Sequence, residues 1–574
     1  MNVETINTDI LILGAGGAGL MAAMHAHIRA PQLDITVVVK GMLGQSGCTR
    51  MVQGGYNAVL NPADSLERHF TDTIKGGAFL NDQELAWILV KEAPARIIEL
   101  ENRAGCMFDR NADGTVHQKP FAGQSFDRTV HRGDLTGIEI MSNLRDYILE
   151  SPIRMLEETR GLDLLQSNSR ITGALLLQMR TGTFVAVNAR AVLLATGGGA
   201  RMYRISSPSL EKSGDGMAMG WRAGAAFSDT EMLQFHPTGL LVGRSIATGG
   251  LLEEGLRGAG AHLINGLGER FMSRYDPKME RATRDVVSRS SYTEIMAGRG
   301  TPNGGIWIDA TRLGEKFLLE NFPGMVERCH DNGFDMLHSR VEVSPSAHYQ
   351  MGGLHIDTQC RTSIDGLFAA GEDAAGVHGA NRLGGNGVAD SIVFGALSGD
   401  VMADSLPATA PQQVSEAHIR ERCDFWSEPL QRAEGERPNV LRRAIENLMW
   451  EKVGLIRNGG DLQSAIDELH VLGERAGRQA AGSEKAFNLS WNEALDVRNI
   501  CLNAELVARG ALLREESRGS HFRSDFPLPN PEWHKRICLQ QKGSGIDVSY
   551  IPVTFTRLAP ADLEPAAAST LSSK

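Results

Sequence analysis

DILILGAGGAG, at residues 9–19, is the segment from which the organisation of this chain can best be inferred. Its apolar half is typical of a buried parallel strand, and the alanine-rich helical pattern LMAAMHAHIRA follows its glycines. A GxGxxG turn between a strand and a helix forms a pyrophosphate site, because glycines let phosphates approach the backbone and the helix dipole favours their charge. The segment therefore predicts an α/β dinucleotide-binding domain, with contacts at Gly14, Ala15, Gly16 and Gly19.

Three further strand patterns extend the predicted sheet. ITVVVK at 35–40 ends in Lys40, where a nicotinamide site would place an acidic residue for a ribose hydroxyl. AVLLATGGG at 191–199 and GLFAAGEDAAG at 366–376 are short apolar strands that end in glycine turns. Either turn alone would be an ordinary strand-to-helix connection. Together they suit one sheet gathered around an extended dinucleotide such as FAD, whose two halves need contacts from distant segments.

The chain has 574 residues, too many for one hydrophobic core, and its residue composition and hydrophobic pattern change along the sequence. A polar stretch with charged helical patches separates the two halves of the predicted sheet and suits a lid domain. Amphipathic helical patterns dominate after residue 411, and the sequence from Leu558 is small, polar and expected to be disordered. We expect a dinucleotide-binding domain in two segments, an inserted domain, a helical domain and a C-terminal tail, at residues 1–241 with 356–410, 242–355, 411–540 and 541–574.

Composition excludes several classes of function. A net charge of −11 disfavours nucleic acid and anionic membranes as partners. No apolar run approaches the roughly 18 residues of a membrane span, and the first residues lack a signal-peptide pattern, so we expect a cytoplasmic protein without membrane insertion of its own. The seven cysteines contain no CxxC pair. They indicate neither a disulfide framework nor a metal or iron-sulfur site, and a redox cofactor is expected to be organic.

A second glycine-rich segment carries many titratable groups. QFHPTGLLVGRSIATGGLLEEGLRGAG, at 234–260, combines a histidine, two adjacent carboxylates and an arginine. Taken alone it could equally be a solvated surface loop. Other polar residues among glycines or turns stand in TRD, AHYQMGG and HGANRLGGNG. Each alone would be a structural ion pair or a core histidine, but as a set they suggest an active site, formed by His236, Glu254, Arg257, Arg284, His348 and Arg382.

The motifs taken together resemble one family. GAGGAGL with VVK, QGGYNAVL, PFAGQS, ATGGG, FHPTG, EEGLRG, TRD, HYQMGG and GEDAAGVHGANRLGGNGVADSIVFG occur in one ordered series. The chain thereby resembles the flavoprotein subunits of succinate dehydrogenase and fumarate reductase, a family that includes L-aspartate oxidase, as far as about Trp533. ESRGSHFRSDFP also looks like the dehydrogenase subunits.

This resemblance implies a fold, a cofactor and a reaction. The implied fold is an FAD-binding Rossmann-like domain in two segments with an inserted α+β capping domain and a C-terminal helical domain. The implied reaction exchanges a hydride between flavin N5 and the C–C bond of a small carboxylic acid, by default succinate and fumarate. The FAD contacts matched by the resemblance are Gly14, Ala15, Gly16, Gly19, Lys40, Cys48, Thr49, Gly54, Gly55, Thr196, Gly197, Asp215, Glu372, Arg382 and Asn386.

The resemblance also assigns roles within the polar set. His348 and Arg382 match ligands of one substrate carboxylate, and His236 matches a ligand of the other end. Arg284 matches the proton-transferring arginine, with Glu254 and Arg257 continuing a relay. Guanidinium hardly deprotonates, so it can act only as one link of such a relay. An iron-sulfur protein is an implied partner, which would bring the chain to the inner face of a membrane.

Three departures from the family pattern bear on substrate and cofactor. Cys48 stands where many members attach FAD through a histidine, so we expect noncovalent FAD, with a cysteinyl thioether as the alternative. Phe121 replaces the glutamate with which aspartate oxidases contact the substrate ammonium. Glu253 replaces a threonine that donates to the distal carboxylate, and Ala259 replaces a nearby acid, which puts the substrate in doubt. The alternatives are an oxidase of aspartate or another amino acid, with Glu253 contacting the ammonium, and an electron-transfer subunit with a vestigial pocket.

Overall fold

A five-stranded parallel sheet forms the centre of the computed structural model, which describes residues 3–243, 245–408, 414–543 and 545–563. The strand order is β18-β11-β2-β3-β7, and every residue of these strands except those of the edge strand β7 is buried, as in a parallel sheet covered on both faces. Their bounds are β2 Ile10–Leu13, β3 Ile35–Val38, β7 Arg154–Leu156, β11 Ala191–Leu194 and β18 Leu367–Ala369. β18 joins the sheet from far along the chain, which confirms the predicted two-segment domain.

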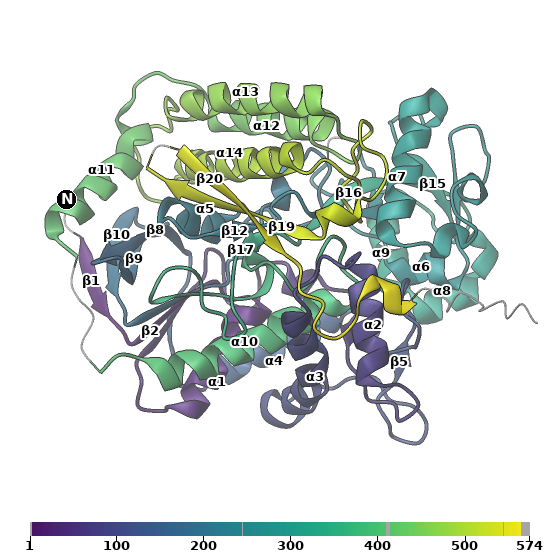
Figure 1. Ribbon diagram of the computed structural model, residues 1–574, viewed down its shortest axis with the longest axis horizontal. Helices are drawn as coiled ribbons and strands as arrows, with labels where there is room; N and C mark the ends of the chain where they lie inside the picture. Colours follow the sequence, from purple (N-terminus) through teal and green to yellow (C-terminus); the bar gives the residue numbers. More distant parts are fainter. Residues whose placement is uncertain (1–2, 244, 409–413, 544, 564–574) are drawn as a thin grey trace, which may run out of the picture.

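Helices α1 (Gly17–Arg29) and α10 (Asn386–Ser405) lie side by side against this sheet (Figure 1). They approach closely because α10 carries glycines at the contact. A Cβ on Gly395 would lie 2.4 Å from the Ala18 carbonyl oxygen, and one on Gly399 would lie 2.3 Å from that of Ala22. Further helices of this domain are α2 Leu66–Gly76, α3 Gln83–Glu99, α4 Thr136–Leu149 and α5 Asp215–Arg222.

Two smaller sheets complete the dinucleotide-binding domain. One has the order β1-β10-β9-β8, with β1 Glu4–Asn7, β8 Thr159–Ser167, β9 Arg170–Gln178 and β10 Thr183–Asn188. The other has the order β4-β6-β5, with β4 Tyr56–Asn57, β5 Gln118–Lys119 and β6 Thr129–Val130. The second of these places Lys119 and the neighbouring Phe121 beside the site described below.

The inserted domain has its own sheet and core, and lies on the right of Figure 1. Its strands have the order β13-β16-β15-β14, with β13 Leu233–Leu240, β14 His262–Ile264, β15 Ile306–Asp309 and β16 Val341–Gln350. Its helices are α6 Glu254–Ala259, α7 Arg284–Glu294, α8 Glu315–Asn321 and α9 Pro323–Asp331. β13 pairs with β16, so this sheet starts at residue 233, before the expected boundary at 242.

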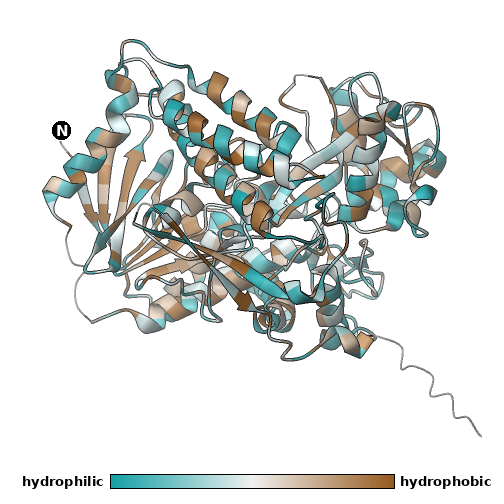
Figure 2. Cartoon of the chain, turned by 45° about the horizontal axis from the view of Figure 1, so that its top comes forward, coloured by the Kyte–Doolittle hydropathy of each residue, from teal (hydrophilic) through white to brown (hydrophobic). Residues whose placement is uncertain are grey.

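The C-terminal part begins with four helices, three of which form a layer across the top of Figure 1. They are α11 Glu416–Gln431, α12 Pro438–Lys452, α13 Gly459–Ala476 and α14 Leu489–Leu513. α12, α13 and α14 bury a shared apolar core, and the helices at the top of Figure 2 carry both hydrophobic and hydrophilic residues accordingly. None of the helices in the described part of the chain is long and apolar enough to cross a membrane.

The end of the chain differs from the expected tail. β19 (Lys535–Lys542) and β20 (Gly545–Pro552) form a hairpin that crosses the expected boundary between residues 540 and 541. β19 also pairs with β12 (Phe227–Ser228), which pairs with β17 (Gly353–Leu354). The hairpin therefore belongs to a sheet whose strands come from distant parts of the chain. Leu558, the start of the segment expected to be disordered, accepts a hydrogen bond from Gln83 at 2.6 Å. Residues 564–574 lie outside the described residues.

Candidate functional site

The turn after β2 forms one end of an elongated cavity. Gly14 has a φ of +115°, and a Cβ there would lie 2.1 Å from the Ala195 carbonyl oxygen. A Cβ on Gly19 would lie 1.8 Å from the carbonyl oxygen of Gly14. Gly16 caps α1 without a side chain, and the first backbone N–H of the helix, that of Gly17, donates to Thr49 Oγ1 at 3.1 Å. The glycines therefore form a backbone cradle that a phosphate can enter, at the positive end of a helix dipole.

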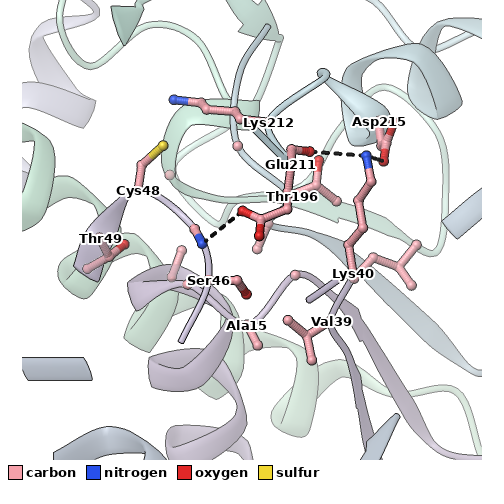
Figure 3. Close-up of a pocket in the computed structure, with 18 of the residues that line it drawn as sticks. Ala15, Val39, Lys40, Ser46, Cys48, Thr49, Thr196, Glu211, Lys212 and Asp215 are labelled. Carbon is pink, nitrogen blue, oxygen red and sulfur yellow. Dashed lines mark hydrogen bonds and ion pairs between the residues drawn. The ribbon is translucent and has the colours of Figure 1, made fainter. Parts of the chain in front are cut away.

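Lys40 and Asp215 line the same cavity, on the side opposite Cys48 (Figure 3). Lys40 Nζ lies 3.2 Å from Asp215 and 2.6 Å from Asp496. Burial alone would raise the pKa of the Asp215 carboxyl, but Arg160 at 3.0 Å and Lys40 outweigh it and hold that pKa below its ordinary value. Lys40 and Arg160 are thus the cations of an ion-pair cluster in the cavity wall.

The turns after β11 and β18 meet at the middle of the cavity. The backbone N–H groups of Thr196 and Gly197 both donate to the Asp373 carboxylate, the second at 2.9 Å. Burial raises the pKa of Asp373 to about 7 against these hydrogen bonds. Glu372 forms an ion pair with Lys212, which lines the cavity near Cys48. Sequence reasoning missed Lys212, because a lysine near a glycine turn is an ordinary surface residue in most chains.

A second cavity continues the first. The two hollows share the lining residues Cys48, Thr49, Lys212, Glu372 and Ser391. Gly54 and Gly55 line the second one. The site thus combines a glycine cradle, a helix N-terminus and a long continuous hollow, and this combination fits an extended dinucleotide.

Asn386, which the resemblance assigns to the cofactor, is not among the residues that line the two cavities. Its Oδ1 accepts a hydrogen bond from Asn57 at 2.7 Å and lies 3.0 Å from His69 Nε2, while its Nδ2 donates to Thr73 at 3.0 Å. The side chain is fully buried and committed to these partners. Asn386 therefore anchors the start of α10, and its neighbours Gly385 and Gly387 line the cavity instead.

The second cavity gathers most of the predicted catalytic set. His236 on β13 and His348 on β16 present their rings edge to face, with centroids 5.5 Å apart. Burial lowers the pKa of both imidazoles well below the usual value. The next largest cause is Arg284 for His236 and Arg382 for His348. Both rings are therefore neutral at neutral pH and act as hydrogen-bonding groups rather than cations.

Arg382 is the cation at this end of the cavity. Its Nη2 lies 3.1 Å from His348 Nε2, and its guanidinium carbon lies 4.6 Å from the centroid of the Tyr349 ring. Its buried Nε has no hydrogen-bond partner within the described residues, and none of their carboxylates forms an ion pair with it. Burial and the nearby Arg284 lower the pKa of Arg382 to about 10. An uncompensated buried guanidinium of this kind is suited to binding a carboxylate.

Arg284 connects the cavity to a buried chain of charges. It donates to Glu254 Oε2 from Nε and Nη2, at 3.0 and 2.7 Å. Arg257 Nη2 donates to the other oxygen of Glu254 at 3.1 Å, and Arg257 Nη1 donates to the Glu280 carbonyl at 2.6 Å. Burial alone would raise the pKa of Glu254, but the two arginines outweigh it and hold that pKa below its ordinary value. Arg257 itself lies behind the cavity wall, as the second step of this chain.

The far wall carries Glu253, whose charge has a partner that the sequence did not reveal. Lys119 Nζ lies 2.7 Å from Glu253 Oε1. The other oxygen, Oε2, is buried without a hydrogen-bond partner in the described part of the chain. Burial raises the pKa of Glu253 in spite of Lys119. Phe121 lines the cavity next to this pair, with its ring centroid 5.9 Å from Lys119 Nζ.

No group of three or more His, Cys, Asp or Glu side chains among residues 3–243, 245–408, 414–543 and 545–563 is placed to hold a metal ion. All seven cysteines fall within these ranges and are free. The groups that this site offers for chemistry are therefore its glycine cradle and its buried charged side chains.

Comparison with known proteins accounts for this arrangement. The family model described as FAD binding domain matches residues 9–388, and the one described as fumarate reductase flavoprotein C-term matches residues 442–569. The protein is an FAD-dependent oxidoreductase, and the elongated cavity with its glycine cradle lies within the residues that match the FAD binding domain. The chain belongs to the family of fumarate reductase and succinate dehydrogenase flavoprotein subunits, which act on CH–CH bonds.

Relatives match it over nearly the whole length. One of them, from the fumarate reductase (CoM/CoB) of Methanothermobacter marburgensis, is 41% identical over 548 residues, covering 94% of this chain and 98% of the relative. The 8-methylmenaquinol:fumarate reductase flavoprotein subunit of Wolinella succinogenes is 37% identical over 536 residues, covering 90% and 86%. A solved structure of an E. coli quinol fumarate reductase FrdA variant matches with a TM-score of 0.91 at 33% identity, covering 97% of this chain and 98% of that one.

Proposed function

We propose that this protein exchanges a hydride and a proton across the C–C bond of a small carboxylic acid, with fumarate and succinate as the default pair. The observation that carries the proposal is the chain Arg284, Glu254, Arg257, which joins the second cavity to buried charges behind its wall. When bound, FAD supplies the hydride chemistry of this reaction. The protein's own residues have to bind the acid, hold its orientation and deliver or remove the proton.

Binding of one carboxylate is assigned to Arg382 and His348. The guanidinium has no carboxylate of the described chain to compensate it, so an incoming carboxylate replaces lost solvation by charge-assisted hydrogen bonds. His348 Nδ1 lies 2.8 Å from Ser207 Oγ, which fixes the ring while Nε2 faces Arg382. Fixed donors around a forming negative charge stabilise a transition state more than a mobile solvent does.

Proton delivery is assigned to Arg284. In the direction of reduction, one proton passes from its guanidinium to the substrate carbon that does not receive the hydride. Glu254 then returns a proton to Arg284, and Arg257 keeps Glu254 in place and continues the path. The two hydrogen bonds between Arg284 and one oxygen of Glu254 support this role, because a proton can pass along them without movement of either residue.

The two alternatives are less well supported. An amino-acid oxidase needs a negative group for the substrate ammonium, and here Phe121 is apolar while Lys119 already compensates Glu253. A vestigial pocket has no use for buried charges, whose burial without function is costly. We also infer a partner subunit, because the relatives are named as subunits, and the resemblance implies that this partner is an iron-sulfur protein.

An assay of the FAD-loaded protein tests the proposal. Under anaerobic conditions, fumarate should oxidise a reduced viologen dye, and succinate should appear in equal amount. Aspartate with oxygen should produce no peroxide. Peroxide from aspartate, or no fumarate-dependent dye oxidation by protein that carries FAD, would contradict the proposed function.

A further inference from the structure

The charged residues that line the second cavity leave two cations without a carboxylate partner. Lys212 forms an ion pair with Glu372, and Arg284 forms one with Glu254. Glu253 is paired with Lys119 from behind the wall. In the described part of the chain, this leaves Arg382 and Arg328 as lining cations with no ion pair to an aspartate or glutamate.

Arg328 lies on α9 of the inserted domain, and none of the roles assigned so far uses it. Its Nη1 donates to the Leu251 carbonyl at 2.8 Å, and Gln53 Nε2 donates to the same carbonyl at 3.2 Å. This contact holds the guanidinium at the cavity wall while other N–H groups stay available. Asp134 acts on Arg328 through space, and the two form no ion pair. Burial lowers the pKa of Arg328, as expected for a cation without a close counter-charge.

The Lys119–Glu253 pair affects the net charge that this wall of the cavity presents to a bound anion. A free glutamate here would repel a second carboxylate of the substrate. With Lys119 at 2.7 Å the pair is close to neutral, and Arg328 is the cation of this wall without an ion pair, acted on by the buried Asp134 only through space. Two uncompensated guanidinium groups in one cavity match an acid with two carboxylates better than one with a single carboxylate.

We propose that Arg328 on α9 binds the second carboxylate of a dicarboxylate substrate, in a cavity where Lys119 neutralises Glu253. Arg328 is then a specificity-determining residue of the site, and the inserted domain supplies the contact that distinguishes a dicarboxylate from a monocarboxylate. This inference rests on the proposed function for the identity of the first carboxylate site at Arg382.

Binding measurements without turnover test it. Fumarate and crotonate differ in that a methyl group of crotonate stands in place of one carboxylate, and both can be titrated against the absorbance of oxidised flavin in the FAD-bound protein. In Arg328→Gln, the Kd of fumarate should rise by roughly 30-fold or more, since truncating one partner of a buried hydrogen-bonded charge pair costs at least that factor. The Kd of crotonate should change by less than about twofold. Arg328→Lys should keep part of the preference for fumarate.

Arg312→Gln is the matched control, because Arg312 is an exposed arginine of the same domain and contacts His262. It should bind both acids as the unchanged protein does. An equal loss of fumarate and crotonate binding in Arg328→Gln, or an unchanged Kd for fumarate, overturns the inference. Because the readout is binding, a protein that binds fumarate selectively but reduces no acid would contradict the proposed function and leave the role of Arg328 standing.

Discussion

Arg284 presents two nitrogens, Nε and Nη2, to a single oxygen of Glu254, at 3.0 and 2.7 Å. The two residues are the first of α7 and the first of α6, so two helix starts meet at the cavity. The other oxygen of Glu254 belongs to Arg257. Each oxygen of this carboxylate thus accepts from one arginine, an arrangement that supports the proposed proton path.

Replacement of Arg284 should separate proton transfer from cofactor binding. Arg284→Gln is expected to lower turnover by on the order of 10²–10⁴-fold, the usual contribution of a positioned proton donor. The flavin absorbance spectrum should stay that of the unchanged protein. Arg289→Gln on the same helix, where the side chain contacts Asp285 and Gly519, is the control and should keep turnover. Turnover retained in Arg284→Gln would remove Arg284 from the relay.

The pair Lys119 and Glu253 should behave as a coupled unit in substrate binding. Lys119→Gln leaves a buried carboxylate without its counter-charge beside the second carboxylate of the substrate, so the Kd of fumarate should rise by about tenfold or more. The double variant Lys119→Gln, Glu253→Gln removes both charges and should bind fumarate within a few-fold of the unchanged protein. Additive effects of the two single substitutions in this cycle would show that the charges do not compensate each other.

Much of this architecture could be predicted from the sequence, because it depends on local signals. The turn at Gly14 needs a left-handed φ and leaves no room for a Cβ, and both requirements appear in sequence as glycine. The two-segment sheet followed from strands that end in glycine turns. The role of Asn386 at the cofactor stays a prediction, since its position in a glycine-rich motif does not reveal that its side chain contacts Asn57 and His69.

Other features depend on contacts between distant segments. Lys119 reaches Glu253 from β5, and no periodicity or motif connects the two positions. Arg328 stands in an amphipathic helix where an arginine is most often a solvated charge. The expected boundary at residue 242 lies after β13, because strand pairing with β16 across about a hundred residues has no local signature.

The neutral state of His236 should appear as a pH dependence of stability. Burial, reinforced by Arg284, lowers the pKa of His236 well below its usual value in the folded protein, so only the unfolded chain takes up this proton below about pH 6.5. The associated stability is complete above that pH and is lost as the pH falls towards the folded-state pKa, by up to about 1.4 kcal/mol per pH unit.

His236→Gln removes this linkage. Between about pH 6.5 and 5, the thermal midpoint of the variant should therefore fall less steeply than that of the unchanged protein. His330→Gln changes an exposed histidine, with a side chain 87% accessible, and should keep the original slope. Parallel slopes for His236→Gln and the unchanged protein would mean that His236 takes up its proton equally in both states.

Cys48 lines both cavities, and we propose that the cofactor beside it is bound noncovalently. Burial raises the pKa of the Cys48 thiol, although Lys212 acts in the opposite direction, so the nucleophilic thiolate is a minor species at neutral pH. Acid precipitation should therefore release all flavin into the supernatant, and Cys48→Ala should keep its flavin absorbance before precipitation. Cys106→Ala, which changes a buried cysteine outside the two cavities, is the control for general effects of thiol removal. Flavin that stays with the precipitated chain, and is lost from it in Cys48→Ala alone, would establish a thioether at this position.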